Sequence, residues 1–204
     1  MSENFELASP RYGRVYNQLL LDFARGRYSE YDRHYHNYNH ICEMISIGKT
    51  LFNIDEIQYH AIIFHDIVYD GMSSYNEEDS VTEMRRWFKH FKGRMLIPFS
   101  DYEIDTIHTI IMDTKKHFYP TIDKSKEVLD LDLMRLAGRL IDVDKNSGDI
   151  RNEFLHVADD QFEIGRRKFF ESLKDVPHIF QTFIGRSRWE PVVRKNVESI
   201  LARG

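Results

Sequence analysis

Three histidines stand within seven residues near the start of the chain, in the stretch RHYHNYNHICEM that covers residues 33–44. They are His34, His36 and His40. A buried packing position would favour Leu or Ile, and a solvated surface would favour Lys or Glu. If residues 36–40 are helical, His36 and His40 lie one turn apart on the same face and can direct two imidazoles at one point. The spacing therefore favours chemistry that needs imidazoles, such as metal binding or proton transfer.

Acidic side chains stand in unusual surroundings at two later points of the chain. The pair His65-Asp66 ends an apolar run, and Asp130 and Asp132 are set among Leu and Val in the stretch EVLDLDLMRL. A carboxylate in an apolar environment is costly unless a cation or hydrogen bonds compensate its charge. Imidazoles and carboxylates without a thiolate form a borderline-to-hard ligand set. This set predicts a site for Mn²⁺, Fe²⁺, Co²⁺, Ni²⁺, Zn²⁺ or Mg²⁺, without distinguishing among these divalent metal ions.

The elements that must position these side chains are helices. Apolar residues recur at three- and four-residue spacing, and Ser, Asn and Asp stand where helix N-caps are expected. No Asn-Gly or Asp-Gly pair with alternating apolar flanks predicts a β-hairpin. Helices are predicted over residues 9–26, 37–52, 53–70, 74–90, 100–117, 125–138, 148–173 and 190–202. The sequence therefore predicts an all-α fold.

Individual helix ends carry further signals. Ser9 and Pro10 are typical of an N-cap and a first helical position, and Gly26 is predicted to end that helix. The other predicted N-terminal signals are Asn53, Ser125 and two capping boxes, Ser74 with Glu77 and Ser100 with Glu103. No repeat or linker divides the sequence. We expect a single domain over residues 1–204, with its core in about 9–137 and the C-terminal helices of about 148–204 packed on it.

The composition excludes several classes of protein. Apolar residues make up 42% and charged residues 30% of the 204 positions, which is typical of a globular domain. The net charge of −5 provides no basic surplus for a nucleic-acid partner. A single cysteine rules out an intrachain disulfide or a Cys-rich zinc module and agrees with a reducing compartment. Without a signal-peptide pattern or an apolar run of about 20 residues, we expect a cytoplasmic protein with no membrane partner and make no prediction of its oligomeric state.

The motifs, in their order along the chain, resemble the HD superfamily of metal-dependent phosphohydrolases. The resemblance is closest to a branch of small bacterial predicted HD phosphohydrolases. Its motifs stand here as Tyr35-His36-Asn37 with His40, FHDIVYD from Phe64 to Asp70, Asn76-Glu77 with Ser80, Thr114 with His117, Asp130-Leu131-Asp132-Leu133, Arg151 with Glu153-Phe154, Gly165-Arg166 and Arg194-Lys195-Asn196. A match that spans nearly the whole chain in order is more specific than an isolated His-Asp pair. It implies an all-α HD-domain bundle with a metal site between its central helices.

The resemblance also implies roles for individual residues. The implied metal ligands are His40, His65, Asp66 and Asp132, with Asp130 as the reserve for Asp132. The implied catalytic residues are Asp66 and His36. His36 belongs to an element, YHN..H, that is similar to the start of the catalytic core of cyclic-nucleotide phosphodiesterases, where the matching histidine protonates the leaving oxygen. The candidate substrate-binding residues are Arg33, Asn37, Asn76, Glu77 and His117, the last being also a candidate ligand of a second metal.

Structural explanations stand beside several of these assignments. His36 could hydrogen-bond a carbonyl or a carboxylate that supports the site, and Asn37 could be a helix cap. Glu77 has a capping role that needs no active site, and His117 could lie at the solvated end of a helix. Arg151 and Glu153 stand two residues apart on a predicted helix and do not face each other. We therefore expect Arg151 and Glu153 to have structural roles.

The expected function is that of a metal-dependent phosphohydrolase acting on a phosphate ester, either a nucleotide or another small phosphomonoester. The alternative is a non-catalytic HD module that binds a metal or a nucleotide and senses it or contacts a partner. A closed metal site uses the same ligand types, so the ligands alone do not separate the two. A third possibility, oxygen chemistry at a di-iron site, needs more ligands than the sequence places. No stretch identifies a base, a sugar or an acyl chain, so the substrate itself is not predicted.

Overall fold

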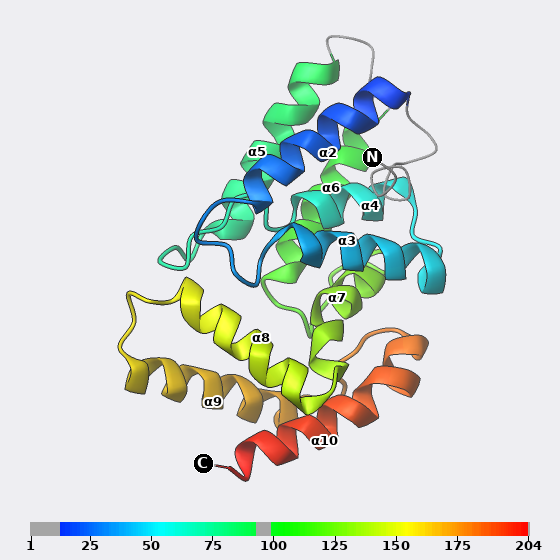
Figure 1. Cartoon of the computed structure of the whole chain (residues 1–204). Helices are drawn as coiled ribbons and strands as arrows, with labels where there is room; N and C mark the ends of the chain where they lie inside the picture. Colours follow the sequence, from blue (N-terminus) through cyan, green and yellow to red (C-terminus); the bar gives the residue numbers. More distant parts are fainter. Residues whose placement is uncertain (1–12, 93–98, 204) are drawn as a thin grey trace.

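The computed structural model describes residues 13–92 and 99–203, and within these ranges the chain forms nine α-helices and no strand (Figure 1). The helices are α2 (Arg14–Tyr28), α3 (Tyr38–Ile47), α4 (Glu56–Phe64), α5 (Asn76–Lys92), α6 (Asp101–Thr114), α7 (Ser125–Leu133), α8 (Leu140–Glu153), α9 (Asp159–Asp175) and α10 (Glu190–Leu201). Three short turns adjoin them: η1 (Gly48–Phe52), η2 (Met134–Ala137) and η3 (Gly185–Trp189). The predicted all-α fold is confirmed. In the described part of the chain, no helix is both long and apolar enough to cross a lipid bilayer.

Helix α4 is the centre of the N-terminal part of the fold. Every residue from Ile57 to Phe64 is buried, so the helix has no solvent-facing side. A helix that is buried all round needs neighbours in every direction. Helices α3, α5, α6 and α7 all pack against α4. Because His65 directly follows this helix, its side chain lies in the protein interior, where only 1% of it is exposed.

The C-terminal helices α8, α9 and α10 form a second layer, which lies below the other helices in Figure 1. Their buried apolar residues make a separate cluster that includes Phe170, Leu173 and Val193. The guanidinium of Arg194 donates to the carbonyl oxygens of Leu173 at 2.7 Å and Val176 at 2.9 Å. The last carbonyls of a helix lack partners within it, so these bonds satisfy the end of α9. They also hold α10 against α9.

Asp130, on α7, connects the two layers. Its Oδ1 accepts a hydrogen bond from the backbone N–H of Gln181 at 2.6 Å. Its Oδ2 accepts from the backbone N–H of Thr182 at 2.9 Å and from the hydroxyl of Thr182 at 2.6 Å. Burial raises the pKa of this carboxyl to about 6, even though these hydrogen bonds lower it. Asp130 therefore holds the segment before α10 against α7.

Two predicted ends of the N-terminal helices differ from the structure. Gly26 does not end α2, which continues to Tyr28 because that side chain is buried and its hydroxyl donates to a carbonyl of α4. The predicted start at Ser9-Pro10 lies outside the described residues. The N-cap of α4 is Asp55 rather than Asn53. Asn53 instead adopts a left-handed conformation, with φ of 51°, at the turn that follows η1.

Later helix ends follow the prediction in part. The capping box of Ser100 with Glu103 is confirmed at the start of α6. Ser125 is the first residue of α7 rather than its N-cap, and its hydroxyl donates to Asp113 at 2.5 Å. The single helix predicted over 148–173 is two helices, α8 and α9. A turn separates them because Arg151 donates to the backbone carbonyls of residues 154 and 157 and so stabilises a break in the helix.

The close approach of Gly185 to α7 gives a test of this packing. A Cβ at Gly185 would lie 2.6 Å from Phe180 Cβ and still closer to the Asp130 carboxylate. Gly185→Ala should therefore lower the free energy of unfolding by roughly 1–3 kcal/mol, the usual cost of overpacking. Gly148→Ala in α8 is the matched control, because a Cβ there meets nothing within 4 Å. It should raise the stability by roughly 0.5–1 kcal/mol, since Ala is favoured over Gly inside a helix.

The free energy of unfolding is measured by urea titration of both variants and the wild type. Equal stability of Gly185→Ala and Gly148→Ala would contradict the tight packing of η3 against α7.

Candidate metal centre

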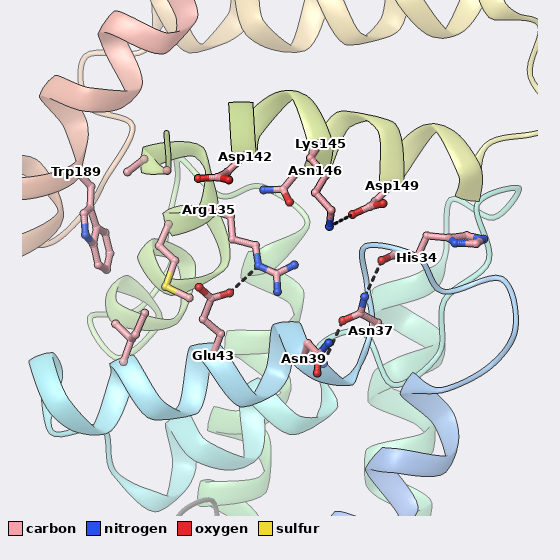
Figure 2. A pocket seen from close by; sticks show the side chains of 14 residues that line it. His34, Asn37, Asn39, Glu43, Arg135, Asp142, Lys145, Asn146, Asp149 and Trp189 are labelled. Atoms are coloured by element: carbon pink, nitrogen blue, oxygen red, sulfur yellow. Dashed lines mark hydrogen bonds and ion pairs between the residues drawn. The ribbon is translucent and has the colours of Figure 1, made fainter. Parts of the chain in front are cut away.

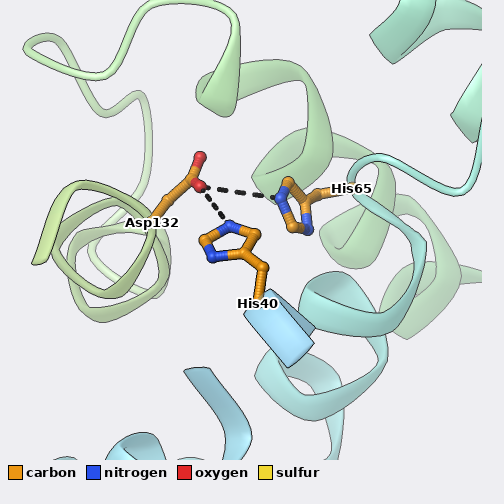
Figure 3. A group of neighbouring side chains, drawn as sticks. All are labelled: His40, His65 and Asp132. Atoms are coloured by element: carbon orange, nitrogen blue, oxygen red, sulfur yellow. Dashed lines mark hydrogen bonds and ion pairs between the residues drawn. The ribbon is translucent and has the colours of Figure 1, made fainter. Parts of the chain in front are cut away.

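Three side chains from separate elements point toward one another between α3, α4 and α7 (Figure 3). His40 lies in the first turn of α3, His65 follows the last residue of α4, and Asp132 lies near the end of α7. Oδ1 of Asp132 is 2.9 Å from Nε2 of His40 and 3.6 Å from Nε2 of His65. One ligand atom from each residue lies within 4.8 Å of the other two. The structure thus brings together three of the four predicted ligands in a group that could hold a metal ion.

Local hydrogen bonds position His40 through its backbone and His65 through its ring. The side chain of Asn37 accepts hydrogen bonds from the backbone N–H groups of Asn39 and His40, at 3.0 and 3.3 Å. Asn37 is thus the N-cap of α3, and His40 lies in the turn that it caps. Nδ1 of His65 lies 2.9 Å from the carbonyl oxygen of Ile62. A carbonyl can only accept, so Nδ1 carries the proton and the lone pair of neutral His65 is on Nε2.

That lone pair faces carboxylate oxygens. Nε2 of His65 lies 3.0 Å from Oδ2 of Asp66 and 3.6 Å from Oδ1 of Asp132, and it has no hydrogen-bond partner. A lone pair and two carboxylates that face one another in the interior repel unless a cation lies among them. Two imidazoles with carboxylate oxygens suit divalent ions of borderline to hard character. The donors therefore fit the divalent ion that the sequence predicts.

The ionisation of the group agrees with this fit. Burial lowers the pKa of His40, which keeps it in the neutral form that binds metal. Burial raises the pKa of Asp132, but the nearby His65 and the hydrogen bonds from His117 and His40 outweigh it and hold this pKa well below its ordinary value. Burial also raises the pKa of Asp66, and the charge of His65 again outweighs it. Both carboxylates are therefore ionised at neutral pH and attract a cation.

The pKa of His65 shifts in the opposite direction, upward. Burial lowers its pKa, whereas the charges of Asp66 and Asp132 raise it well above the ordinary value of histidine. A proton and a metal ion therefore compete for Nε2 of this residue, and binding of the metal releases the proton.

The remaining predicted ligands lie beside the group or away from it. Asp66 is next to His65 but is not among the three side chains whose ligand atoms lie within 4.8 Å of one another. Its roles as a ligand and in catalysis stay predictions. Asp130, the reserve ligand, lies away from the group. Both of its oxygens accept hydrogen bonds from the segment before α10, and Asp132 is the carboxylate of α7 that faces His40 and His65.

His36 lies at the site, just before the helix rather than within it. Asn37 is the N-cap of α3, so His36 precedes the helix. Its Nδ1 is 2.7 Å from Oε2 of Glu153, and Oε1 of Glu153 accepts the backbone N–H groups of Tyr35 and His36 at 2.6 and 2.9 Å. Burial lowers the pKa of His36, but the hydrogen bond to Glu153 and the nearby negative charges leave this pKa above its ordinary value. Glu153 thus fixes the ring and favours its protonated form.

Glu153 is the site residue that sequence reasoning missed. It ends α8, and Arg151 two residues earlier faces away to pair with Asp159 at 2.5 Å. The loop that follows Asp66 packs directly on this helix end, because a Cβ at Gly71 would lie 2.7 Å from the carbonyl oxygen of Glu153. The available signal was the position of Glu153 in the ordered resemblance. Spacing within its own helix gives no sign of its partner, since His36 lies more than a hundred residues earlier.

His117 joins the site from the turn after α6. Its Nε2 lies 2.7 Å from Oδ2 of Asp132, the oxygen opposite to the one that faces His40. The structure therefore brings His117 to the metal group, as one of its predicted roles requires. Its position leaves both of those roles, substrate binding and a second metal, as predictions.

Two other candidates, Arg33 and Asn76, bind protein backbone. The guanidinium of Arg33 is buried and donates to the carbonyl oxygens of Asp66 at 2.6 Å and Ile67 at 3.1 Å. The side-chain amide of Asn76 accepts from the N–H and donates to the carbonyl of Asp70, both at 3.0 Å. Both residues therefore hold the loop that carries His65 and Asp66, and their predicted contact with substrate stays a prediction.

Asn37 and Glu77 also have protein partners. Glu77 lies in the first turn of α5, 3.4 Å from Nζ of Lys115. Asn37, besides capping α3, lines a polar cavity of about 600 Å³ between α3 and α8, together with Arg135 and Lys145 (Figure 2). The cavity that borders the metal group is a different one, on the other side of α8. Asn37 is not among the residues that line it.

No model of a known protein family, no curated protein and no solved structure matches the chain significantly. The resemblance to the HD superfamily therefore stays a prediction from the motifs. The buried group of His40, His65 and Asp132 is the part of that prediction for which the structure gives geometric support.

Metal content tests the ligand set. Ala at His40, His65 or Asp132 should each lower the bound divalent metal and reduce the thermal stabilisation that added metal gives, because a site formed only in the folded chain stabilises that fold. Asp130→Ala should lower the free energy of unfolding by roughly 1–3 kcal/mol, because it leaves the backbone N–H groups of Gln181 and Thr182 without partners. The variant should keep its bound metal. His34→Ala is the control, because this residue is exposed.

Elemental analysis after dialysis measures the metal content, and melting curves with and without Mn²⁺ measure the thermal stabilisation. Full metal content in Asp132→Ala together with loss in Asp130→Ala would reverse the assignment.

Proposed function

We propose that the protein is a metal-dependent phosphohydrolase of the HD superfamily that cleaves a small phosphomonoester. The observation that carries this proposal is the pairing of His36 with the buried Glu153 at the cavity that borders the metal group. His36, His117 and Asp132 all line that cavity, so the histidine proposed as proton donor and one carboxylate of the metal group face the same space. Such an arrangement suits hydrolysis of an ester that enters the cavity.

Under this proposal, the metal group and His36 have separate roles. His40, His65 and Asp132 would hold the ion, which when bound supplies a water of lowered pKa and neutralises phosphate charge. His36 is the general acid. Because Nδ1 of His36 is bonded to Glu153, Nε2 is the nitrogen that can deliver a proton to the leaving oxygen. Glu153 keeps the ring in place and raises its pKa, so that the proton is present near neutral pH.

The same pairing argues against the non-catalytic alternative. A protein that only holds a metal needs its ligands and the groups that orient them. It does not need a further histidine, outside the metal group, that a buried carboxylate orients toward the adjoining cavity. Retention of a positioned proton donor is expected of an enzyme that protonates a leaving group.

Turnover is the direct test of the proposal. The purified protein loaded with Mn²⁺ should release inorganic phosphate from phosphomonoesters, and chelation should abolish the release. Asp132→Asn should lose this activity together with its metal, whereas His34→Ala should keep both. A panel of phosphomonoesters, nucleotides and cyclic nucleotides, assayed with each of the six candidate metals, makes the measurement. Absence of phosphate release from every ester with every metal would overturn the proposal.

The leaving group tests His36. His36→Ala should keep its metal and slow hydrolysis of an alkyl phosphate by roughly 10²–10⁴-fold, the usual contribution of positioned proton transfer. The loss should be much smaller with p-nitrophenyl phosphate, whose leaving anion needs no proton. A loss of metal in His36→Ala would show instead that His36 is a ligand.

The pH profile tests Glu153. The amide of Glu153→Gln has one oxygen and so cannot accept from both His36 and the backbone N–H groups that Glu153 now binds. Its loss of charge should lower the pKa of His36. A general acid is lost as the pH rises through its pKa, so the alkaline fall in kcat should move to lower pH. A merely structural role for Glu153 would reduce the rate without moving that limb.

A further inference from the structure

The metal group borders a cavity of about 530 Å³ between α8 and α9. His36, His117 and Asp132 line it where it borders the metal group. The volume lies within the range of roughly 300–1,000 Å³ that is usual for small-molecule sites. An ester whose phosphate reaches the metal group would therefore place its alcohol part in this cavity. The residues that line the cavity indicate which kind of alcohol fits.

Helix α9 contributes an apolar stripe to the lining. Phe162, Gly165 and Phe169 recur at three- and four-residue spacing, Phe170 follows Phe169, and all four line the cavity. The polar residues of α9 that line it are Gln161 and Arg166. Phe169 is 41% exposed, although its ring could be covered by an occupant. Covering such surface with an apolar group is favourable by about 25 cal/mol per Å². The α9 side therefore favours a hydrocarbon over a polar ligand.

The opposite side of the cavity is mainly apolar too. Val143 and Ile150 contribute to it from α8, one turn before and one turn after Ser147, and the polar residues of α8 in the lining are Ser147 and Asn146. Leu133 and Leu136 contribute near the metal end, at the end of α7 and in η2. The hydroxyl groups of a ribose beside the phosphate would be buried against these leucines at a cost in lost hydration.

Positive charge is scarce in the same lining. Arg166 is the only Lys or Arg among the described residues that line the cavity. Its guanidinium lies 3.5 Å from a carboxylate oxygen of Glu163 and 3.7 Å from one of Asp144, so its charge is already balanced. A nucleoside di- or triphosphate carries further phosphates, which normally need additional cations or N–H donors. Beyond the metal group, the N–H donors of the lining are Nε of Arg166 and the side-chain amides of Asn146 and Gln161, and no Lys or Arg free of carboxylates is among its described residues.

We propose that the substrate is a phosphomonoester of an aliphatic alcohol, with its phosphate at the metal centre and its hydrocarbon chain in the cavity between α8 and α9. This inference rests on the phosphohydrolase function proposed above. Water adds at phosphorus, and the bond between phosphorus and the ester oxygen breaks. The products are inorganic phosphate and the alcohol, whose oxygen takes the proton that His36 delivers.

Chain length is the variable that tests this assignment. The Mn²⁺-loaded wild type is assayed with n-alkyl phosphates from ethyl to dodecyl and with adenosine monophosphate. The kcat/KM should rise up to about fourfold per added methylene, from roughly 0.8 kcal/mol per buried methylene, and then level off when the cavity is full. Calorimetric titration with n-alkylphosphonates, which are not hydrolysed, should show the same dependence in Kd.

Gly165 allows the cavity to be shortened without strain. It lies in the middle of the α9 stripe, and a Cβ there meets nothing within 4 Å. Gly165→Leu should fold well, because Leu is favoured over Gly in a helix. Its loss in kcat/KM should grow with chain length and reach at least about tenfold for decyl phosphate, the effect of excluding two or more methylenes. Gly148→Leu on α8 is the matched control, since Gly148 is equally unhindered and does not line the cavity.

The outcomes separate the two proposals. Alkylphosphonate binding that strengthens with chain length, without cleavage of any ester, would leave the cavity assignment standing and overturn the hydrolase. Cleavage of adenosine monophosphate with no effect of chain length on either kcat/KM or Kd would overturn the cavity assignment and leave the hydrolase standing. Equal behaviour of Gly165→Leu and Gly148→Leu toward decyl phosphate would also overturn the cavity assignment.

Discussion

Nε2 of His65 faces the carboxylates of Asp66 and Asp132 inside the protein, and the surrounding helices hold it there. Helix α4 is buried on all sides, so the residue that follows it cannot turn to solvent. The carbonyl of Ile62 holds the proton on the other nitrogen of the ring. Such a grouping is unfavourable unless a proton or a metal ion binds Nε2, because each member loses the hydration that it would have in water. The fold thus holds two carboxylates and an imidazole nitrogen where a divalent ion would stabilise them.

Asp130 and Asp132 show how one helix serves both the fold and the site. Two residues apart on α7, they point in different directions, since successive residues of an α-helix are turned by about 100°. Asp130 binds the segment before α10, and Asp132 faces the imidazoles. One helix thus attaches the C-terminal layer through Asp130 and contributes Asp132 to the group that includes His40 and His65.

The sequence was sufficient for the helical fold and for most of the metal group. Periodicity and caps are local properties, and His40 beside a cap and His65 after an apolar run are visible without tertiary information. The choice between Asp130 and Asp132 rested on resemblance, because both carboxylates have the same local surroundings. The contact of Glu153 with His36 was not predictable from local pattern, since it joins distant segments. The non-helical position of His36 follows from Asn37 acting as the cap, which sequence analysis had named only as one option.

Helix α8 contributes one side of the apolar cavity and ends in Glu153, whose carboxylate orients His36. Helix α9 contributes the other side of that cavity, and it carries neither His36 nor any residue of the metal group. The two sides are therefore unequal targets for protein engineering. If the protein is the phosphohydrolase proposed above, redesign of the α9 surface would change which ester is accepted and leave the contact between Glu153 and His36 intact. Redesign of α8 would then change selectivity and proton transfer together, so variation that broadens the substrate range is expected to accumulate on α9.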